Sequence, residues 1–209
     1  MAKDRDQALD KAYSLESAEE VVDLYRDWAD RYDHDTVERF GYVAPQRTVA
    51  VFLRHFSDRA ARVIDVGCGT GLAGEVLRDE GFTNVDGLDI SPEMLEAARE
   101  KGVYRELIEA DLTKPLDIPS DSYDAVVSVG TFTHGHVGPE GLEELIRITR
   151  AGGVITFSIN EGVYQEYGFE AAYRSLADRG VAAVVETVES DYLVKEGISS
   201  FVTTLKVAG

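Results

Sequence analysis

The sequence predicts an α/β fold in which helices cover both faces of a mostly parallel sheet. The first sign is the alternation of strand-like apolar runs with helix-length segments from residue 62 to residue 180, because such alternation builds parallel sheets with crossover helices. The second is a run of three glycines at alternate positions directly after the first strand. The third is a pair of long β-rich runs near the C-terminal end, which predicts a hairpin that adds one antiparallel strand at the sheet edge.

Composition and charge bound the function before any motif is considered. At 209 residues the chain is long enough for one domain with a substantial core. Its 39 acidic and 21 basic residues give a net charge of -18, which argues against a nucleic-acid partner because phosphate binding needs clustered lysine and arginine. The first residues lack the apolar stretch of a secretory signal, and no apolar run is long enough to span a bilayer. We expect a cytoplasmic protein without a membrane partner; the oligomeric state stays open.

The N-terminal part predicts an amphipathic helix. Ser17 and Glu20 form a capping box, in which two side chains satisfy backbone N–H groups at a helix start. We expect this helix to end within residues 28–33. Its apolar residues recur at helical spacing on roughly one face: Val21, Leu24, Tyr25, Trp28 and Tyr32. This stripe fits either a core helix or a lid over a ligand.

A second helix is predicted before the first strand. Gly41 breaks the chain, and Pro45 suits the first turn of a helix that runs to about Phe56. We assign residues 1–56 to an N-terminal helical cap and residues 57–209 to the α/β core of a single domain.

Proline and glycine then mark where the core elements begin and end. Ser91 before Pro92 reads as an N-cap with proline at the first helical position, while Gly81, Gly102 and Gly180 end helices. The predicted strands are 62–67, 84–89, about 104–109, 123–129 and 154–159, followed by the hairpin runs 181–194 and 199–207. The predicted helices are 70–80, 93–101, 139–150 and about 163–179.

The run Asp65-Val66-Gly67-Cys68-Gly69-Thr70-Gly71 predicts a nucleotide-binding turn. Glycine adopts positive φ and lets a ligand lie directly on the backbone, and the helix that follows offers unpaired N–H groups at its start. Asp89 lies 18 residues after Gly71 and ends the second strand, where an acid can hydrogen-bond both hydroxyls of a ribose. The alternative role for Asp89 is to cap the next helix.

Two nucleotide cofactors are compatible with these glycines. Gly69, Gly71 and Gly74 match the dinucleotide fingerprint by letter, which would make the chain an NAD-dependent oxidoreductase. In that fingerprint, however, the first glycine ends the strand, whereas here the strand ends at Gly67. Asp65 would also repel a pyrophosphate, and it suits a ligand that carries an ammonium group.

The same run resembles motif I of the class I S-adenosylmethionine-dependent methyltransferases. The resemblance extends from the first predicted strand to the fifth through 87–95, 110–112 and 123–128. More narrowly, Lys101-Gly102-Val103-Tyr104, 129–137 and Trp28-Ala29-x-x-Tyr32-Asp33 are similar to the Williams–Beuren-region methyltransferase-like proteins. The resemblance to the class I methyltransferases implies a Rossmann-like fold with a seven-stranded sheet whose last strand is antiparallel. The N-terminal helical cap would be an addition to this fold.

The resemblance also implies a cofactor, S-adenosylmethionine with its product S-adenosylhomocysteine, and the residues that would contact it. Around the methionine part these are Asp65, Gly67, Gly69, Gly71, Ser128 and Val129, with Trp28 and Tyr32 as a lid. Around the ribose and adenine they are Asp89, Ile90, Met94, Asp111 and Leu112. Two of these keep a simpler alternative, since Asp111 is also a turn former and Met94 is also a core residue.

Methyl transfer is an in-line displacement that needs the acceptor held about 3–3.5 Å from the methyl group and water kept out. The loop after the fourth strand carries the candidate base, His134, since histidine can take a proton at neutral pH; a loop-bracing role is its alternative. Asn160, Glu161 and Tyr164 are candidates for the acceptor pocket. Two histidines in a glycine-rich loop without a nearby acid pair fall short of a ligand set, so no metal is expected.

These observations favour an S-adenosylmethionine-dependent methyltransferase that acts on a small molecule. The alternatives are a methyltransferase of a protein or RNA acceptor and a non-catalytic protein that binds the same cofactor. The identity of the acceptor and of the accepting atom stays open.

Overall fold

The computed structural model describes residues 20, 24, 32–135 and 137–209. The predicted capping box at Ser17 and the predicted cofactor contact of Trp28 lie outside these residues, as does most of the apolar stripe of the first helix. Glu20 and Leu24 are helical. No helix in the described ranges is long and apolar enough to cross a membrane.

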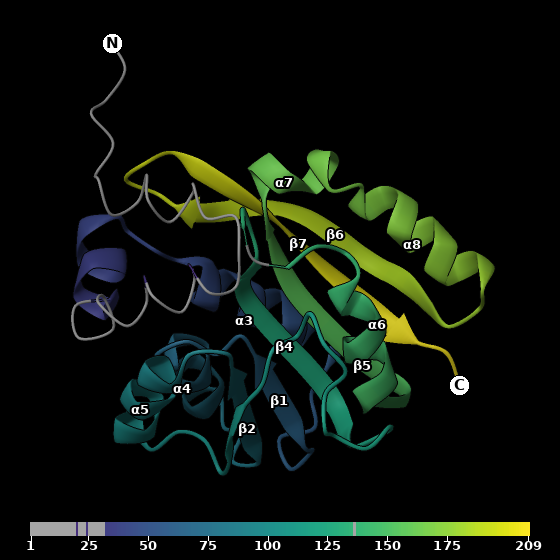
Figure 1. The fold of residues 1–209 in the computed structure, drawn as a ribbon, viewed down its shortest axis with the longest axis horizontal. Helices are drawn as coiled ribbons and strands as arrows, with labels where there is room; N and C mark the ends of the chain where they lie inside the picture. Colours follow the sequence, from purple (N-terminus) through teal and green to yellow (C-terminus); the bar gives the residue numbers. More distant parts are fainter. Residues whose placement is uncertain (1–19, 21–23, 25–31, 136) are drawn as a thin grey trace.

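The described chain builds a seven-stranded sheet in the order β3-β2-β1-β4-β5-β7-β6 (Figure 1). Six strands run in the same direction, and β7 runs antiparallel to both of its neighbours. The strands are β1 (Val63–Val66), β2 (Val85–Asp89), β3 (Leu107–Glu109), β4 (Tyr123–Phe132), β5 (Thr149–Asn160), β6 (Ala182–Leu193) and β7 (Ile198–Val207). The predicted mostly parallel sheet with an antiparallel last strand is confirmed.

The place of the antiparallel strand differs from the prediction. β7 lies inside the sheet between β5 and β6, and β6 forms the edge. The burial of the two strands explains this order: Val202 and Leu205 of β7 are fully buried, whereas β6 exposes Val184 and Val185. The more apolar strand of the hairpin takes the inner position because it can be covered on both faces.

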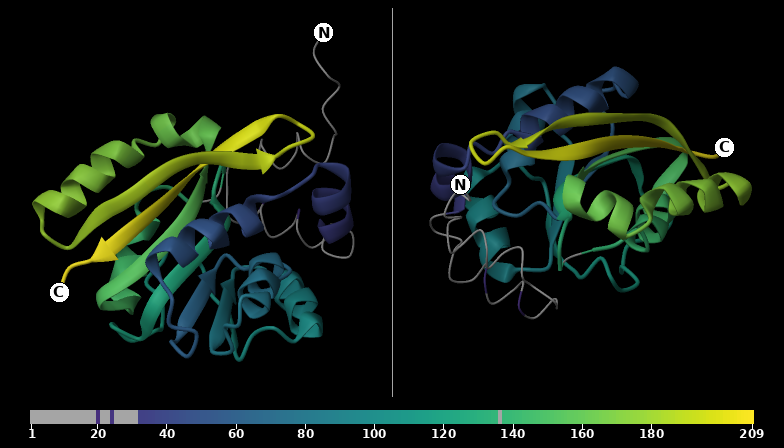
Figure 2. Two further views of the ribbon diagram at one scale, coloured as in Figure 1. Left: turned by 180° about the vertical axis from the view of Figure 1, so that it is seen from behind. Right: turned by 90° about the horizontal axis from the view of Figure 1, so that it is seen from above.

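Helices cover both faces of the sheet. α3 (Ala44–His55) and α4 (Leu72–Asp79) pack on one face, while α6 (Gly141–Ile148), α7 (Glu161–Glu166) and α8 (Phe169–Asp178) pack on the other. α5 (Pro92–Lys101) lies beside β2 and β3. Figures 1 and 2 show α3 and α6 on opposite sides of the sheet.

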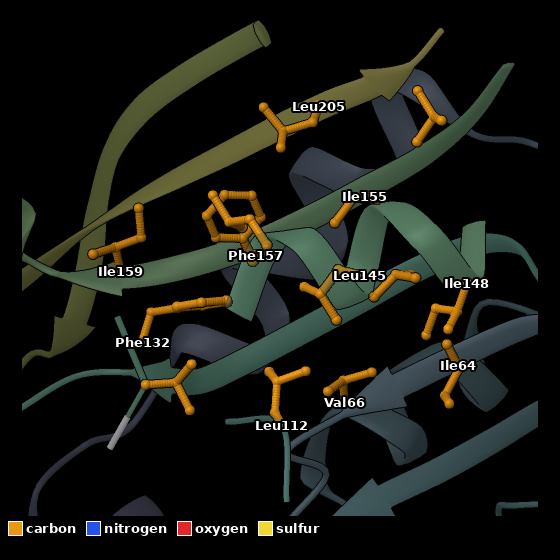
Figure 3. Close-up of a cluster of buried hydrophobic side chains, with 14 of the residues drawn as sticks. Ile64, Val66, Leu112, Phe132, Leu145, Ile148, Ile155, Phe157, Ile159 and Leu205 are labelled. Carbon is orange, nitrogen blue, oxygen red and sulfur yellow. The ribbon is translucent and has the colours of Figure 1, made fainter. Parts of the chain in front are cut away.

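The alternation of side chains along β1 divides the core into these two layers. Ile64 and Val66 point into the cluster with α6 and α8 (Figure 3), while Val63 points into the cluster with α3 and α4. Successive strand residues face opposite sides of a sheet, so a fully buried strand needs apolar residues at nearly every position. Asp65 is the exception in β1, and it is also fully buried.

Several element boundaries differ from the prediction; β4 extends to Phe132 and β5 begins at Thr149, for example. Three other differences have a clear local cause. The chain stays helical beyond Asp33, as the π-helix η1 (His34–Arg39). The predicted helix 163–179 is two helices, because Gly168 between α7 and α8 adopts φ 74°. β3 begins at Leu107 rather than at residue 104, since Tyr104 and Arg105 turn their side chains toward Asp65 and Asp86.

The C-terminal hairpin holds the segment that joins the cap to the core. Val43 N donates to Tyr192 O at 3.1 Å, and Val194 N donates to Gly41 O at 3.1 Å. Gly41 has φ 70°, and a Cβ there would lie 2.7 Å from Val194 Cγ2. The segment therefore forms a short antiparallel pairing with the hairpin, through Tyr42 and Leu193, just before α3.

Candidate functional site

A cavity of about 760 Å³, counted to its open mouth, lies at the C-terminal ends of β1, β2 and β4. β1 and β4 are adjacent in the sheet, and the strand order reverses between them. Open α/β sheets bind ligands at such a point. The cavity is lined by Tyr32, Gly67, Gly69, Leu88, Asp89, Ile90, Met94, Ala110, Asp111, Leu112, Thr113, Val129, Gly130, Thr131 and Val137.

The glycine turn forms the floor of this cavity at the end of β1. Gly67, Gly69 and Gly71 have φ values of 71°, 52° and 93°, a region that side chains other than glycine rarely adopt. A Cβ on Gly67 would overlap Thr131, whereas a Cβ on Gly69 would meet no protein atom within 4 Å. The backbone of Gly69 is therefore open to a ligand. Gly71 does not line the cavity; it is the N-cap residue of α4.

Asp89 closes the glycine turn from the end of β2. Its Oδ2 accepts a hydrogen bond from Gly69 N at 2.7 Å, and its Oδ1 accepts one from Ser91 N at 3.0 Å. Burial raises the pKa of Asp89, and the hydrogen bonds from these backbone N–H groups oppose that rise. An ionised carboxylate has about four acceptor positions. Asp89 can therefore brace the turn and still accept from ligand hydroxyls.

The far end of the cavity combines apolar walls with an ionised acid. Ile90, Met94 and Leu112 supply the walls, and Met94 is 2% exposed, so it belongs to the core and to the cavity. Asp111 Oδ1 accepts from Thr113 N at 2.9 Å, and its Oδ2 lies 2.9 Å from the Lys114 Nζ. Burial alone would raise the pKa of Asp111, but the hydrogen bonds from Thr113 and Lys114 outweigh it and lower the pKa.

Asp65 lies beneath the glycine turn and does not line the cavity. Tyr104 Oη donates to its Oδ2 at 2.6 Å, while its Oδ1 is buried without a hydrogen-bond partner among the described residues. Burial raises the pKa of Asp65 to about 7; the hydrogen bond from Tyr104 lowers it and the nearby charge of Asp89 raises it. The unpaired oxygen is a position that a donor from a bound ligand would satisfy.

β4 reaches the cavity through an irregularity in its pairing with β5. The register shifts between Ser128 and Phe132, and Val129, Gly130 and Thr131 in this interval line the cavity. Such bulges are common beside functional sites. Ser128 itself is fully buried and donates to Val66 O at 2.7 Å, so it fastens β4 to β1 beneath the site.

His134 lies farther along the same strand end and does not line the cavity. It is half-buried, and a Cβ on Gly162 would lie 2.5 Å from its Nε2. The ring therefore sits against the start of α7. There Asn160 accepts from Gly162 N as the helix N-cap, at 2.9 Å, and Tyr164 stacks on Phe201 with ring centroids 4.2 Å apart. Glu161 is exposed.

The described part of the cap is fastened to the glycine turn. Thr70 Oγ1 donates to Asp33 Oδ1 at 2.5 Å. Lys101 Nζ lies 2.6 Å from Asp33 Oδ2 and 2.8 Å from Glu75 Oε2. Tyr32, one residue before Asp33, lines the cavity. These contacts hold one turn of the cap against the site.

Sequence reasoning missed Tyr42 and Tyr104. A second cavity, of about 310 Å³, adjoins the glycine turn and is lined by Tyr32, Tyr42, Pro45, 67–70, Leu72, Ala73 and Val129. A Cβ on Gly130 would lie 2.8 Å from the Tyr42 Oη. Gly74 carried a usable signal, because glycine inside a helix usually has a packing reason: a Cβ there would lie 2.5 Å from the Tyr104 Oη. This contact accounts for Gly74 without a dinucleotide.

Comparison with known proteins identifies the family. Residues 64–157 match a family described as a methyltransferase domain. Methyltransferase-like protein 27 of Homo sapiens is 35% identical over 147 residues, which are 69% of this chain and 59% of that protein. A 2-methyl-6-phytyl-1,4-hydroquinone methyltransferase of Oryza sativa is 33% identical over 67% of this chain and 40% of its own length. An 18S rRNA (guanine-N(7))-methyltransferase of Bos taurus is 39% identical over 34% of this chain and 25% of its own.

Thus the chain spans from a quarter to three fifths of the length of these relatives.

Solved structures show the same fold. A chain in the complex with the Haloferax volcanii Trm112 methyltransferase activator has a TM-score of 0.68 at 22% identity and covers 90% of this chain and 98% of its own. The [4+2]-cyclase SpnF has a TM-score of 0.69 at 16% identity, and the match covers 93% of this chain and 97% of SpnF.

The human relative confirms the resemblance to the Williams–Beuren-region methyltransferase-like proteins. The fold, the matched domain and the sequence relatives agree, and they confirm the resemblance of this chain to the class I S-adenosylmethionine-dependent methyltransferases.

Proposed function

We propose that this protein is an S-adenosylmethionine-dependent methyltransferase that acts on a small-molecule acceptor. The observation that carries the proposal is the single cavity that joins an open glycine backbone, two acids at strand ends and an apolar wall.

The residues at the site fit the parts of this cofactor. The open backbone of Gly69 suits the methionine part, and the unpaired buried Oδ1 of Asp65 suits a donor such as its ammonium group, directly or through water. Asp89 keeps acceptor capacity for the ribose beyond its bonds to the backbone. Asp111, held ionised, would accept from the amino group of adenine between Ile90, Met94 and Leu112.

When bound, the cofactor supplies an electrophilic methyl group on a sulfonium. The chain's own contribution would be to hold the acceptor in line, about 3–3.5 Å away, and to exclude water. We assign water exclusion to the proposed cap, residues 1–56, of which Tyr32 lines the cavity. The smaller cavity beside Tyr42 is our candidate for the acceptor.

His134 is the candidate acid–base residue for acceptors that must lose a proton. It lies at the same end of the sheet as the cavity, near the start of α7. His134 is not among the residues that line the cavity, which also fits the loop-bracing alternative, and a variant distinguishes the two roles below.

The acceptor class rests on charge. The relatives' names include an rRNA guanine and a hydroquinone as acceptors, so relatedness alone does not choose between them. A net charge of -18 disfavours RNA because it repels the phosphate backbone.

A labelling experiment tests this proposal. The protein is incubated with methyl-labelled S-adenosylmethionine and a cell extract, which is then separated into protein, RNA and small-molecule fractions. We expect label in the small-molecule fraction, at a level that an Asp89→Ala variant abolishes. Label confined to RNA or protein would contradict the acceptor class, and no transfer in any fraction would support a non-catalytic binding role.

A further inference from the structure

The run from Lys101 to Tyr104 extends from the last residue of α5 toward β3, and it packs against the underside of the glycine turn. The ring of Tyr104 lies in a slot that three glycines leave open: a Cβ on Gly74 would lie 2.5 Å from its Oη, one on Gly71 would lie 3.1 Å from Cε2, and one on Gly87 would lie 3.2 Å from Cδ1. Side chains at these positions would close the slot. The ring is therefore held in one place by α4, β2 and the turn.

The hydroxyl at the end of this ring orients Asp65. Tyr104 Oη donates to Asp65 Oδ2 at 2.6 Å, within the range of short hydrogen bonds to a carboxylate. With Oδ2 engaged, Oδ1 is the oxygen that remains, and it is buried without a partner in the part of the chain that the structure describes. A carboxylate fixed through one oxygen presents the other in one direction.

The groups that face Asp65 decide its charge. Asp89 faces it from β2, Cys68 from the glycine turn and Tyr104 from the segment after α5. Burial raises the pKa of the Cys68 thiol and of the Tyr104 hydroxyl well above their ordinary values, so both stay protonated. Lys101, on α5, is paired with Asp33 and Glu75. Tyr104 therefore supplies the hydrogen bond that favours the ionised form of Asp65.

We infer that Tyr104 is a positioning residue that orients Asp65 toward the ammonium group of a bound ligand. The inference rests on the proposed function, in which that group belongs to the methionine part of the cofactor. It assigns a role to the Lys101–Tyr104 run, which no cavity contact explains.

Two ligands and one variant test it. S-adenosylhomocysteine carries the ammonium group, and 5′-methylthioadenosine lacks the whole amino-acid part. Tyr104→Phe keeps the ring in its slot and removes only the hydroxyl. By calorimetry at pH 7.5 we expect this variant to bind S-adenosylhomocysteine about tenfold more weakly, because it loses a hydrogen bond to a carboxylate that contacts the ligand's ammonium group. It should bind methylthioadenosine within about twofold of the parent.

The pH dependence gives a second readout. The pKa of Asp65 is about 7 with the Tyr104 hydrogen bond in place, and that bond lowers it. Loss of the hydroxyl should therefore raise the pKa of Asp65 further. The ratio of variant to parent dissociation constants for S-adenosylhomocysteine should therefore be larger at pH 6.5 than at pH 8.5. Carboxyl carbon resonances of the ligand-free protein should report the same upward shift for Asp65.

Tyr123→Phe is the matched control. Tyr123 Oη also donates to a buried acid, Asp86 Oδ2, at 3.0 Å, but near the start of β2. It should leave both affinities and the Asp65 titration unchanged. Equal weakening of both ligands by Tyr104→Phe, or none, would overturn the inference. A parent that binds neither ligand would instead overturn the proposed function.

Discussion

Replacing Asp89 with alanine should weaken cofactor binding, and it should also destabilise the glycine turn that the carboxylate braces. The carboxylate is 9% exposed and already accepts from the backbone N–H groups of Gly69, Ser91 and Ile90, and its remaining acceptor capacity is available to the ribose. Loss of hydrogen bonds to a charged group costs about 1.5–3 kcal/mol each. If they are only partly additive, the loss is about 3 kcal/mol, or roughly a hundredfold in Kd.

Calorimetric titration with S-adenosylhomocysteine measures this effect. The control is Ser91→Ala, because Ser91 Oγ accepts from Met94 N at 3.3 Å as the N-cap of α5 and does not line the cavity. That variant should lose about 1 kcal/mol of unfolding free energy and keep its affinity. An Asp89→Ala variant with an unchanged Kd would refute the reasoning and leave Asp89 as a brace of the turn.

Three further predictions concern other parts of the molecule. Burial would raise the pKa of Asp86, but its arginine and tyrosine partners hold it below the ordinary value, so its contribution to stability is complete above about pH 4 and is lost as the pH falls further. In Asp86→Asn, urea unfolding between pH 4 and pH 2 should show a smaller loss than in the parent, and an equal loss would contradict this. Asp33→Asn removes the charge that pairs with Lys101, so amide exchange over residues 32–40 should speed up; identical exchange rates would argue against a docked cap. His134→Gln should bind S-adenosylhomocysteine normally but lose about 10²- to 10⁴-fold in transfer if it is the base, whereas activity within a few-fold of the parent would leave it as a brace.

The parts that sequence analysis predicted well are those in which local pattern and tertiary role coincide. The glycine turn needs positive φ at Gly67, Gly69 and Gly71, and the structure has it at all three. The N-cap at Ser91 and the helix end at Gly102 are likewise set by neighbouring residues. Such features can be deduced because the residues that cause them are adjacent in the chain.

The features that sequence analysis missed depend on contacts between distant segments. Tyr104 and Asp65 are 39 positions apart in the chain. The sequence around Tyr104 predicted the start of a strand and a family resemblance, but not this contact. The inner place of β7 depends on which hairpin strand is better covered by helices. Gly168 divides α7 from α8 although the apolar spacing on either side reads as one helix.

The measurement that tests the central claim most directly is an amide resonance titration of the ¹⁵N-labelled parent protein with S-adenosylhomocysteine, repeated with NAD. The account predicts saturable shifts at Gly67, Gly69 and Thr113, which line the cavity at its two ends, and no such shifts with NAD. Shifts at these amides with NAD alone, or S-adenosylhomocysteine shifts confined to residues outside the cavity, would contradict it.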